Sequence, residues 1–208
     1  MHYVCPMQVA QTIPPGERVG TADQRVVMHG VPWSHFEAIL ALRGDASGPR
    51  ISYLRGELEF MSPSRSHESV KSLLARMIEL HALETGVRLS AYGSWTLRNS
   101  RAERAAEPDE CYIVGDTRQK EAPDLVVEVI WTSGGLDKLE LYRGLGVSEV
   151  WLWRDEVIRI FRLEGDRYVE APKSHVLPEI DTALIAKLAG YEDQHAAVVA
   201  FRTALRRV

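Results

Sequence analysis

The chain has 208 residues, of which 45% are hydrophobic and 26% are charged, which is typical of one globular domain and excludes disordered, collagen-like and coiled-coil classes. The formal net charge is −4, from 25 basic and 29 acidic residues, so nucleic-acid binding would require a local basic patch. The apolar runs are far too short to span a bilayer, and residues 1–20 lack the features of a secretory signal, so we expect a cytoplasmic protein without a membrane partner.

Two residue types bear on chemistry through their counts. Neither Cys5 nor Cys111 belongs to a Cys-x-x-Cys pair, so we expect idle thiols and neither a disulfide framework nor structural zinc. Only 5 of the 25 basic residues are lysines. Because lysines are rare in this chain, a lysine near a cluster of acidic residues is a better candidate for a functional role than it would be in a lysine-rich protein.

The first half of the chain predicts a flexible arm over residues 1–24, followed by one domain over residues 25–208. A short strand is expected at 25–28, and a helix at 35–43 that Ser34 caps. Apolar and polar residues alternate over 51–61 on either side of Arg55-Gly56, which predicts a hairpin.

Helical spacing then predicts a long helix over 66–85, which Gly86 ends. The second half reads as short strands and helices around one uninterrupted apolar run, which predicts a central strand at 125–130. The other strands are expected at 87–92, 95–98, 110–114, 149–153 and 157–163, and the helices at 136–145 and, as two helices broken at Gly190, over 183–208. Residues 99–108 are expected to be a loop. These elements together predict a mixed α/β domain.

Glu128 is the anomaly in this pattern, because it stands at the centre of a strand that is otherwise leucine, valine and isoleucine. A buried carboxylate must be paired, protonated or bound to a metal. An ion pair with one of the many arginines is the simplest explanation. His67 and His81 lie on the predicted long helix, where histidines are usually structural. The chain has no motif of serine hydrolases, nucleotide-binding loops or zinc proteases.

Several short motifs in a fixed order carry a family resemblance. They are Leu54-Arg-Gly-Glu-Leu-Glu-Phe-Met, His67-Glu68 at the start of a helix, Glu107-Pro-Asp-Glu, Pro123-Asp-Leu-Val-Val-Glu-Val, Leu136-Asp-Lys-Leu with Tyr142, and Gly146-Val-Ser-Glu-Val-Trp. Over about residues 30–165 the chain resembles the Uma2 family of restriction-endonuclease-like proteins, formerly a domain of unknown function.

The resemblance implies the PD-(D/E)xK nuclease fold, a mixed sheet of four or five strands flanked by helices, with a divalent metal held by carboxylates on adjacent strands. It implies that Asp109 and Glu128 are the metal ligands and that Lys138 is the catalytic lysine. Glu57 and His67 match further residues that recur near the site in the family.

The chain departs from the wider nuclease pattern at Ile130, which stands two residues after Glu128 where a lysine is expected. Lys138 can serve instead if the helix that follows packs back on the sheet. Tyr142 would then lie on the same helical face, one turn later. Carboxylate ligands without a cysteine or histidine cluster favour Mg²⁺ or Mn²⁺ over Zn²⁺.

Three functions from different classes stay open. The first is a Mg²⁺-dependent endonuclease that hydrolyses DNA phosphodiester bonds, as a homodimer that cuts both strands. The second is a catalytically silent nuclease-fold domain that binds nucleic acid or protein. The third is a hydrolase of another phosphate-containing small molecule. Divalent metal binding at Asp109 and Glu128 discriminates the first from the second.

Overall fold

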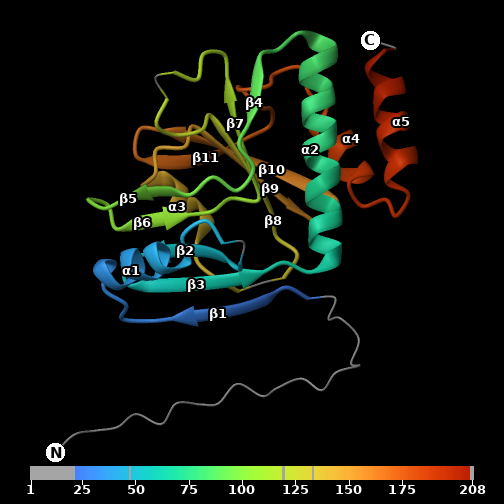
Figure 1. Cartoon of the computed structure of the whole chain (residues 1–208). Coiled ribbons are helices and arrows are strands. Elements are labelled where there is room, and N and C mark those ends of the chain that lie inside the picture. The colour runs from blue at the N-terminus through green and yellow to red at the C-terminus, as the bar shows by residue number, and fades with distance from the viewer. Residues whose placement is uncertain (1–21, 47, 119, 133, 207–208) are drawn as a thin grey trace, which may run out of the picture.

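The computed structural model describes residues 22–206, except 47, 119 and 133. Two sheets and five helices make up this part of the chain (Figure 1). Sheet A has the strand order β1-β3-β2-β6-β5 and sheet B the order β11-β10-β9-β8-β7-β4. Within the described residues, no helix combines the length and the apolar character that crossing a membrane requires.

Sheet A is antiparallel throughout. Its strands are β1 (Gln24–Met28), β2 (Arg50–Leu54), β3 (Glu57–Ser62), β5 (Leu97–Asn99) and β6 (Arg104–Ala106). The expected hairpin is confirmed as β2 and β3, and positive φ angles at Arg55 and Gly56 form its two-residue turn. Helix α1 (Trp33–Arg43) covers one face, where Phe36 packs against Tyr53 with ring centroids 5.2 Å apart.

Sheet B contains the central strand β8 (Leu125–Val129), which is buried along its whole length. Its other strands are β4 (Leu89–Ala91), β7 (Glu110–Val114), β9 (Glu149–Arg154), β10 (Val157–Glu164) and β11 (Arg167–Ala171). Strands β8 and β9 form the parallel pair of the sheet, and α3 (Lys138–Arg143) lies in the crossover between them.

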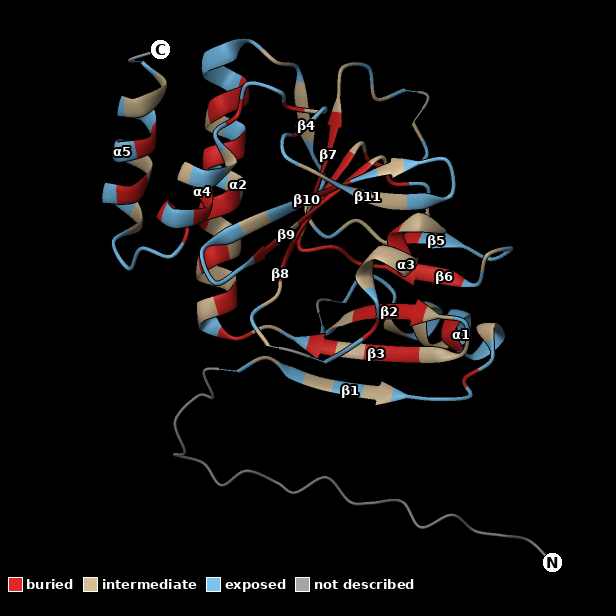
Figure 2. Cartoon of the chain, turned by 180° about the vertical axis from the view of Figure 1, so that it is seen from behind, coloured by how far each residue is buried: buried red, intermediate tan, exposed pale blue. Residues whose placement is uncertain are grey.

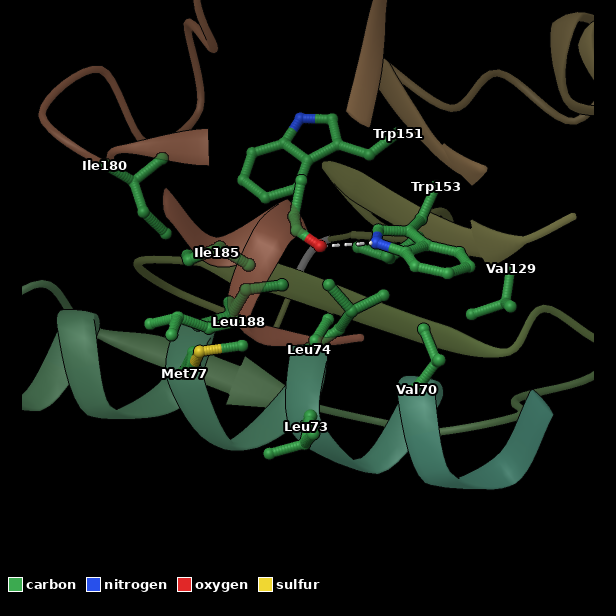
Figure 3. Packing of buried hydrophobic residues seen from close by; sticks show 14 of the residues in the cluster. Val70, Leu73, Leu74, Met77, Val129, Trp151, Trp153, Ile180, Ile185 and Leu188 are labelled. Carbon is green, nitrogen blue, oxygen red and sulfur yellow. Dashed lines mark hydrogen bonds between the residues drawn. The ribbon is translucent and has the colours of Figure 1, made fainter. Parts of the chain in front are cut away.

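Helices α2 (Arg65–Thr85) and α4 (Thr182–Leu188) cover one face of sheet B, and α5 (Gln194–Leu205) packs on these two helices (Figure 1). Leu73, Leu74 and Met77 of α2 pack in one core with Trp151 and Trp153 of β9 (Figure 3). The two tryptophans share this face, as their spacing predicts. Figure 2 shows how burial concentrates between α2 and the central strands.

The opposite face of sheet B packs on α3 and on sheet A. Val126, Leu141 and Tyr142 belong to this second core, together with Leu97 and Ala106 of sheet A. Glu128 points to the same face, because side chains alternate along β8 and Val126 stands two residues before it. The fold therefore closes the two sheets over Glu128.

The expected mixed α/β class is confirmed, and four details differ from expectation. The strands form two sheets rather than one sheet of four or five. The expected loop at 99–108 contains β6, whose Arg-Ala-Ala sequence has no strand signal and is ordered by pairing with β2 and β5. Helix α1 begins at Trp33 after Pro32, so Ser34 is not its cap. The expected arm extends to residue 24, but Gln24 already belongs to strand β1. Residues 1–21 of the expected arm lie outside the described residues.

Candidate active site

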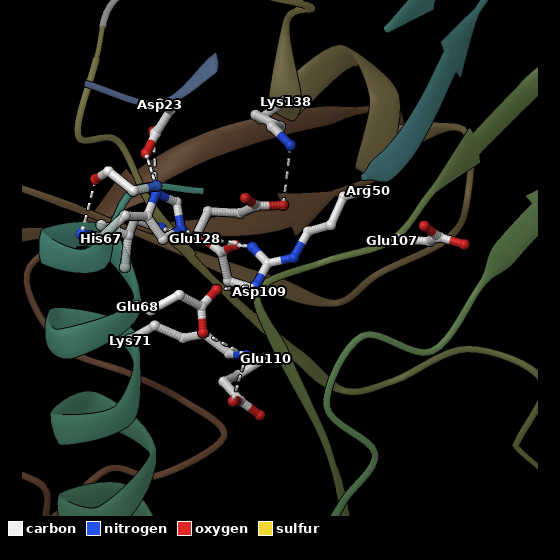
Figure 4. A network of polar contacts seen from close by, with 12 residues as sticks. Asp23, Arg50, His67, Glu68, Lys71, Glu107, Asp109, Glu110, Glu128 and Lys138 are labelled. Carbon is white, nitrogen blue, oxygen red and sulfur yellow. Dashed lines mark hydrogen bonds and ion pairs between the residues drawn. The ribbon is translucent and has the colours of Figure 1, made fainter. Parts of the chain in front are cut away.

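Asp109 and Glu128 face each other at the end of two adjacent strands of sheet B. The antiparallel register pairs Glu110 with Val127, and one further step places Asp109 opposite Glu128. Both residues are 1% exposed. The backbone N–H of Val129 donates to Asp109 Oδ2 at 2.7 Å, which fixes this carboxylate against the strand of Glu128. Figure 4 shows Asp109 and Glu128 with Arg50, His67 and Lys138 around them.

Helix α3 supplies two donors to Glu128. Lys138 Nζ lies 3.2 Å from Glu128 Oε1, and the Tyr142 hydroxyl donates to the same oxygen. Asp137 caps the helix by accepting from the backbone N–H of Glu140 at 3.0 Å, which holds Lys138 in the first turn. Burial and the Glu128 charge raise the pKa of Tyr142, so the phenol stays protonated and can donate.

Arg50 and His67 contact Asp109 from the other side. The Arg50 guanidinium pairs with Asp109 Oδ1 and reaches Glu68 Oε1 at 2.8 Å. His67 Nε2 lies 3.0 Å from the same Asp109 oxygen. A protein cation therefore stands beside each buried carboxylate, Arg50 at Asp109 and Lys138 at Glu128.

The position of His67 depends on Ser64 and Asp23. Ser64 caps α2 by accepting from the backbone N–H of His67, and its own N–H donates to Asp23 Oδ1 at 2.9 Å. Asp23 Oδ2 lies 3.0 Å from His67 Nδ1. Burial opposes ionisation of Asp23, yet the donors from Ser64 and His67 hold the pKa of Asp23 below its ordinary value.

Burial lowers the pKa of His67 although the charge of Asp23 opposes this effect, so the imidazole is neutral near neutral pH. We assign its proton to Nδ1, because Asp23 accepts there and Asp109 is already paired with Arg50. Nε2 then carries the lone pair and accepts from Arg50 Nη1 at 3.5 Å, the guanidinium that also pairs with Asp109.

Glu57 is not brought into this cluster. Its carboxylate is half exposed and lies 3.1 Å from His29 Nδ1 at the surface. Glu59, two residues along the same face of β3, is the buried acid of this strand: it lies 3.1 Å from Arg25 Nε and accepts from the backbone N–H of Leu136 at 3.2 Å. The sequence places both acids on one face of β3, and only the packing of the two sheets distinguishes them.

Asp23 and Arg50 are members of the site that the sequence analysis did not identify. Asp23 falls in the expected arm, and Arg50 stands at the start of a hairpin strand without a local motif. The Asp23 side chain contacts a residue 44 positions away, so periodicity along the chain cannot reveal the pair.

A cavity of about 320 Å³ opens beside Lys138, on the same face of sheet B as Glu128. Arg25 and Arg154 line it together with Lys138, and Glu59 and Asp137 are its acidic lining residues. Three cations against two anions make it the basic side of the site. This cavity lies outside the carboxyl ends of the parallel strands β8 and β9, the usual ligand position of such sheets.

The donor set fits a hard divalent cation in its chemistry. Mg²⁺ usually keeps several waters and uses one or two carboxylates, and Asp109 and Glu128 supply two. Among the described residues, both donors to Glu128 use Oε1, which leaves Oε2 for a cation. No group of three or more histidine, cysteine or acidic side chains in the described ranges could hold an ion by itself. A cation here would rest on these two carboxylates, water and substrate oxygens.

Three comparisons place the chain among known proteins. The sequence model of the Uma2 family, described as "Putative restriction endonuclease", matches residues 33–188. The crystal structure of a protein from Anabaena variabilis ATCC 29413, titled "a putative nuclease belonging to DUF820", is similar with a TM-score of 0.45 and 13% sequence identity, over 76% of this chain and 96% of that one. The comparison with curated proteins found no match. The family model covers most of the chain, and it includes the site residues from Arg50 to Tyr142. The protein therefore belongs to the Uma2 family, whose model carries the description "Putative restriction endonuclease".

Proposed function

We propose that the protein is a nuclease that depends on Mg²⁺ or Mn²⁺ and hydrolyses phosphodiester bonds of DNA, with Asp109 and Glu128 as the metal ligands. The observation that carries the proposal is the pair of buried carboxylates that stand opposite each other, Asp109 just before β7 and Glu128 on β8, with a cation beside each. Two anions buried together are costly unless cations neutralise them; Arg50 and Lys138 do so in this structure, and a divalent ion would add its charge at Glu128 Oε2.

Mg²⁺, when bound, would neutralise charge on the phosphoryl oxygens and make a water more acidic. Lys138 Nζ, at 3.2 Å from Glu128, is close enough to the carboxylate pair to hold a phosphate oxygen or the attacking water. Tyr142 holds the Glu128 carboxylate in place through its hydroxyl.

His67 has the geometry of a positioned base. Asp23 fixes the ring by accepting from Nδ1, which leaves the lone pair on Nε2 beside Arg50 and Asp109. Such an imidazole can accept a proton from a water near Asp109, because burial lowers its pKa and keeps it neutral at neutral pH. Glu57 has no part in this proposal, and Glu59 is a structural acid that pairs with Arg25 and anchors the start of the α3 segment.

DNA as the substrate is supported by the family and by the basic cavity of Arg25, Lys138 and Arg154. A homodimer would place two such sites on the two strands of a duplex.

The test compares Asp109→Asn, Glu128→Gln and Lys138→Met by calorimetric Mn²⁺ titration and by plasmid nicking. The first two variants remove a charged ligand oxygen, so Mn²⁺ affinity and cleavage should both fall. Lys138→Met should leave Mn²⁺ binding nearly unchanged and slow cleavage by roughly 10²–10⁴-fold.

Glu149→Gln is the matched control for these variants. Glu149 is also a buried acid of sheet B, and it accepts from Trp151, Ser174 and His175 away from the site. This variant should bind Mn²⁺ like the parent. Parent-like Mn²⁺ binding by Glu128→Gln would refute the shared metal site, and parent-like cleavage by Lys138→Met would refute the role of the lysine.

A silent nuclease-fold binding domain is the second candidate, and one observation favours it. Arg50 and Lys138 already pair with the two carboxylates, so the site is electrostatically satisfied by the protein alone. If the parent protein binds DNA in a gel-shift assay but neither binds Mn²⁺ nor nicks plasmid, this second function is correct.

A further inference from the structure

A second and larger cavity lies on the opposite face of sheet B, also at the carboxyl ends of β8 and β9. Its volume is about 700 Å³, within the range of roughly 300–1,000 Å³ that is usual for ligand sites. The first turns of α2, the end of β9 and the segment after α4 line it. None of its lining residues takes part in the carboxylate cluster.

Aromatic side chains dominate one wall of this cavity. Trp131 stacks on Trp153 with ring planes 5° apart and centroids separated by 6.1 Å. Trp131 is nevertheless 38% exposed, and Tyr191, which also lines the cavity, is 42% exposed. A flat ring that is held by a second ring and still faces an open cavity is suited to stack on another planar group.

The charge of the cavity is opposite to that of its neighbour. Asp155, Glu156 and Glu192 line it, with Arg65 as the cation. Asp155 and Glu156 form the two-residue turn between β9 and β10 with positive φ angles of 48° and 60°, a conformation that usually selects Asn-Gly. An acidic lining disfavours a phosphate, but it accepts hydrogen bonds from the amino and imino groups of a nucleobase.

The two cavities lie on either side of the segment 130–132, which follows the central strand β8. Side chains alternate along the chain there, so Ile130 and Thr132 line the basic cavity while Trp131 between them lines the aromatic one. Thr132 Oγ1 also lies 3.4 Å from Asp23 Oδ2, the oxygen that holds His67. Trp131 of the aromatic cavity is therefore the neighbour in sequence of Thr132, which contacts Asp23 of the candidate active site.

We propose that the aromatic cavity binds one unpaired nucleobase of the substrate strand, stacked on Trp131, while the adjoining phosphate lies in the basic cavity at Lys138. The inference deepens the proposed nuclease function and rests on it. A base inside a duplex cannot reach such a wall, so the substrate strand is single-stranded here or has this base turned out of the stack.

The test measures binding of a short fluorescent single-stranded DNA by anisotropy in Ca²⁺, which replaces Mg²⁺ so that binding is read without turnover. One strand carries guanine at a central position, a second carries thymine there, and a third has an abasic site. The full-length protein should prefer the guanine strand over the abasic strand by about tenfold, the size of one stacked base. Trp131→Ala should abolish this preference, and Trp131→Phe, which keeps an aromatic face, should retain most of it.

Glu156→Gln should reduce the preference for guanine over thymine, because guanine offers the exocyclic amine that thymine lacks. Thermal melting of each variant shows whether a loss of binding reflects a loss of fold, and Trp131→Phe keeps the test decisive if Trp131→Ala is unstable. An equal preference for guanine over the abasic strand in the parent and in Trp131→Ala overturns the proposal.

Two further outcomes separate this inference from the proposed function. Plasmid nicking that needs Asp109 and Glu128, without any base preference, overturns the base site and leaves the nuclease intact. Base preference that needs Trp131, without nicking, supports the base site and refutes the nuclease. If all three strands bind equally and tetramethylammonium displaces them, the inference is overturned. The cavity is then a site for organic cations.

Discussion

Replacing Arg50 by methionine tests whether Asp109 belongs to a metal site or only to a structural ion pair with Arg50. Arg50 pairs with Asp109 Oδ1, and Asp109 is 1% exposed. Methionine has a similar length and no charge, so the variant leaves a buried carboxylate without its cation. If the site is built for a divalent metal, added Mn²⁺ should replace the missing charge.

Removing one partner of a buried ion pair costs about 3–5 kcal/mol in the free energy of unfolding. Asp109 keeps the hydrogen bond from the backbone N–H of Val129 at 2.7 Å, which favours the lower end of that range. For a domain of this size each kcal/mol shifts Tm by about 2–4 °C. Arg50→Met in EDTA should therefore melt about 6–12 °C below the parent, on these two magnitudes.

The assay is thermal melting, followed by circular dichroism, in EDTA and over a Mn²⁺ series. A ligand at about 100 times its Kd stabilises the folded state by about 2.7 kcal/mol, so Mn²⁺ should restore most of the loss in Arg50→Met. The gain should exceed that of the parent protein, in which Arg50 competes with the ion for Asp109 Oδ1.

Arg43→Met is the matched control. Arg43 makes an ion pair with Glu107, which is 6% exposed and also accepts from the backbone N–H of Ile51. This variant should lose a similar amount of stability, and Mn²⁺ should restore none of it, because the partners of Glu107 among the described residues are donors: Arg43, Ile51 and Thr96. Equal Mn²⁺ responses in Arg50→Met and Arg43→Met, or no response in either, would refute the reasoning; Arg50→Lys provides a second variant if Arg50→Met does not fold.

Three further predictions concern stability and reactivity. Phe201→Ala should lower Tm by about 6–20 °C, since Phe201 of α5 is 0% exposed in the core against α2 and truncating a buried phenylalanine costs about 3–5 kcal/mol; an exposed position of α5, such as Val199→Ala, should have little effect in the same melts. Burial lowers the pKa of His81 from its ordinary 6.5, so the unfolded chain binds more protons and stability should fall as the pH drops below about 6.5; His81→Gln should show a smaller drop in denaturant midpoint, and an unchanged drop would contradict the assignment. Burial raises the pKa of Cys111 to about 12, so in a Cys5→Ala background the thiol should fail to react with Ellman's reagent until the protein is unfolded in urea.

Local patterns in the sequence were sufficient for most elements. The turn at Arg55-Gly56, the stop at Gly86 and the apolar run of β8 each depend on residues within a few positions of one another. The pairing of Lys138 and Tyr142 toward Glu128 also follows from local geometry, because residues four apart on a helix share a face. The family resemblance pairs Asp109 with Glu128, and the strand register places these two residues opposite each other.

The remaining members of the site depend on how the two sheets close over each other. Asp23 meets His67 across 44 positions of the chain, and Arg50 of sheet A meets Asp109 of sheet B, without any repeat or spacing that relates them. The same packing turns Glu59 inward and leaves Glu57 at the surface, although both lie on one face of β3. Side-chain periodicity is a property of one element, whereas the neutralisation of a buried carboxylate depends on which charge another element brings to it. The sequence by itself therefore determined the elements and the two carboxylates, and only the tertiary structure decided which cations and which histidine partner surround them.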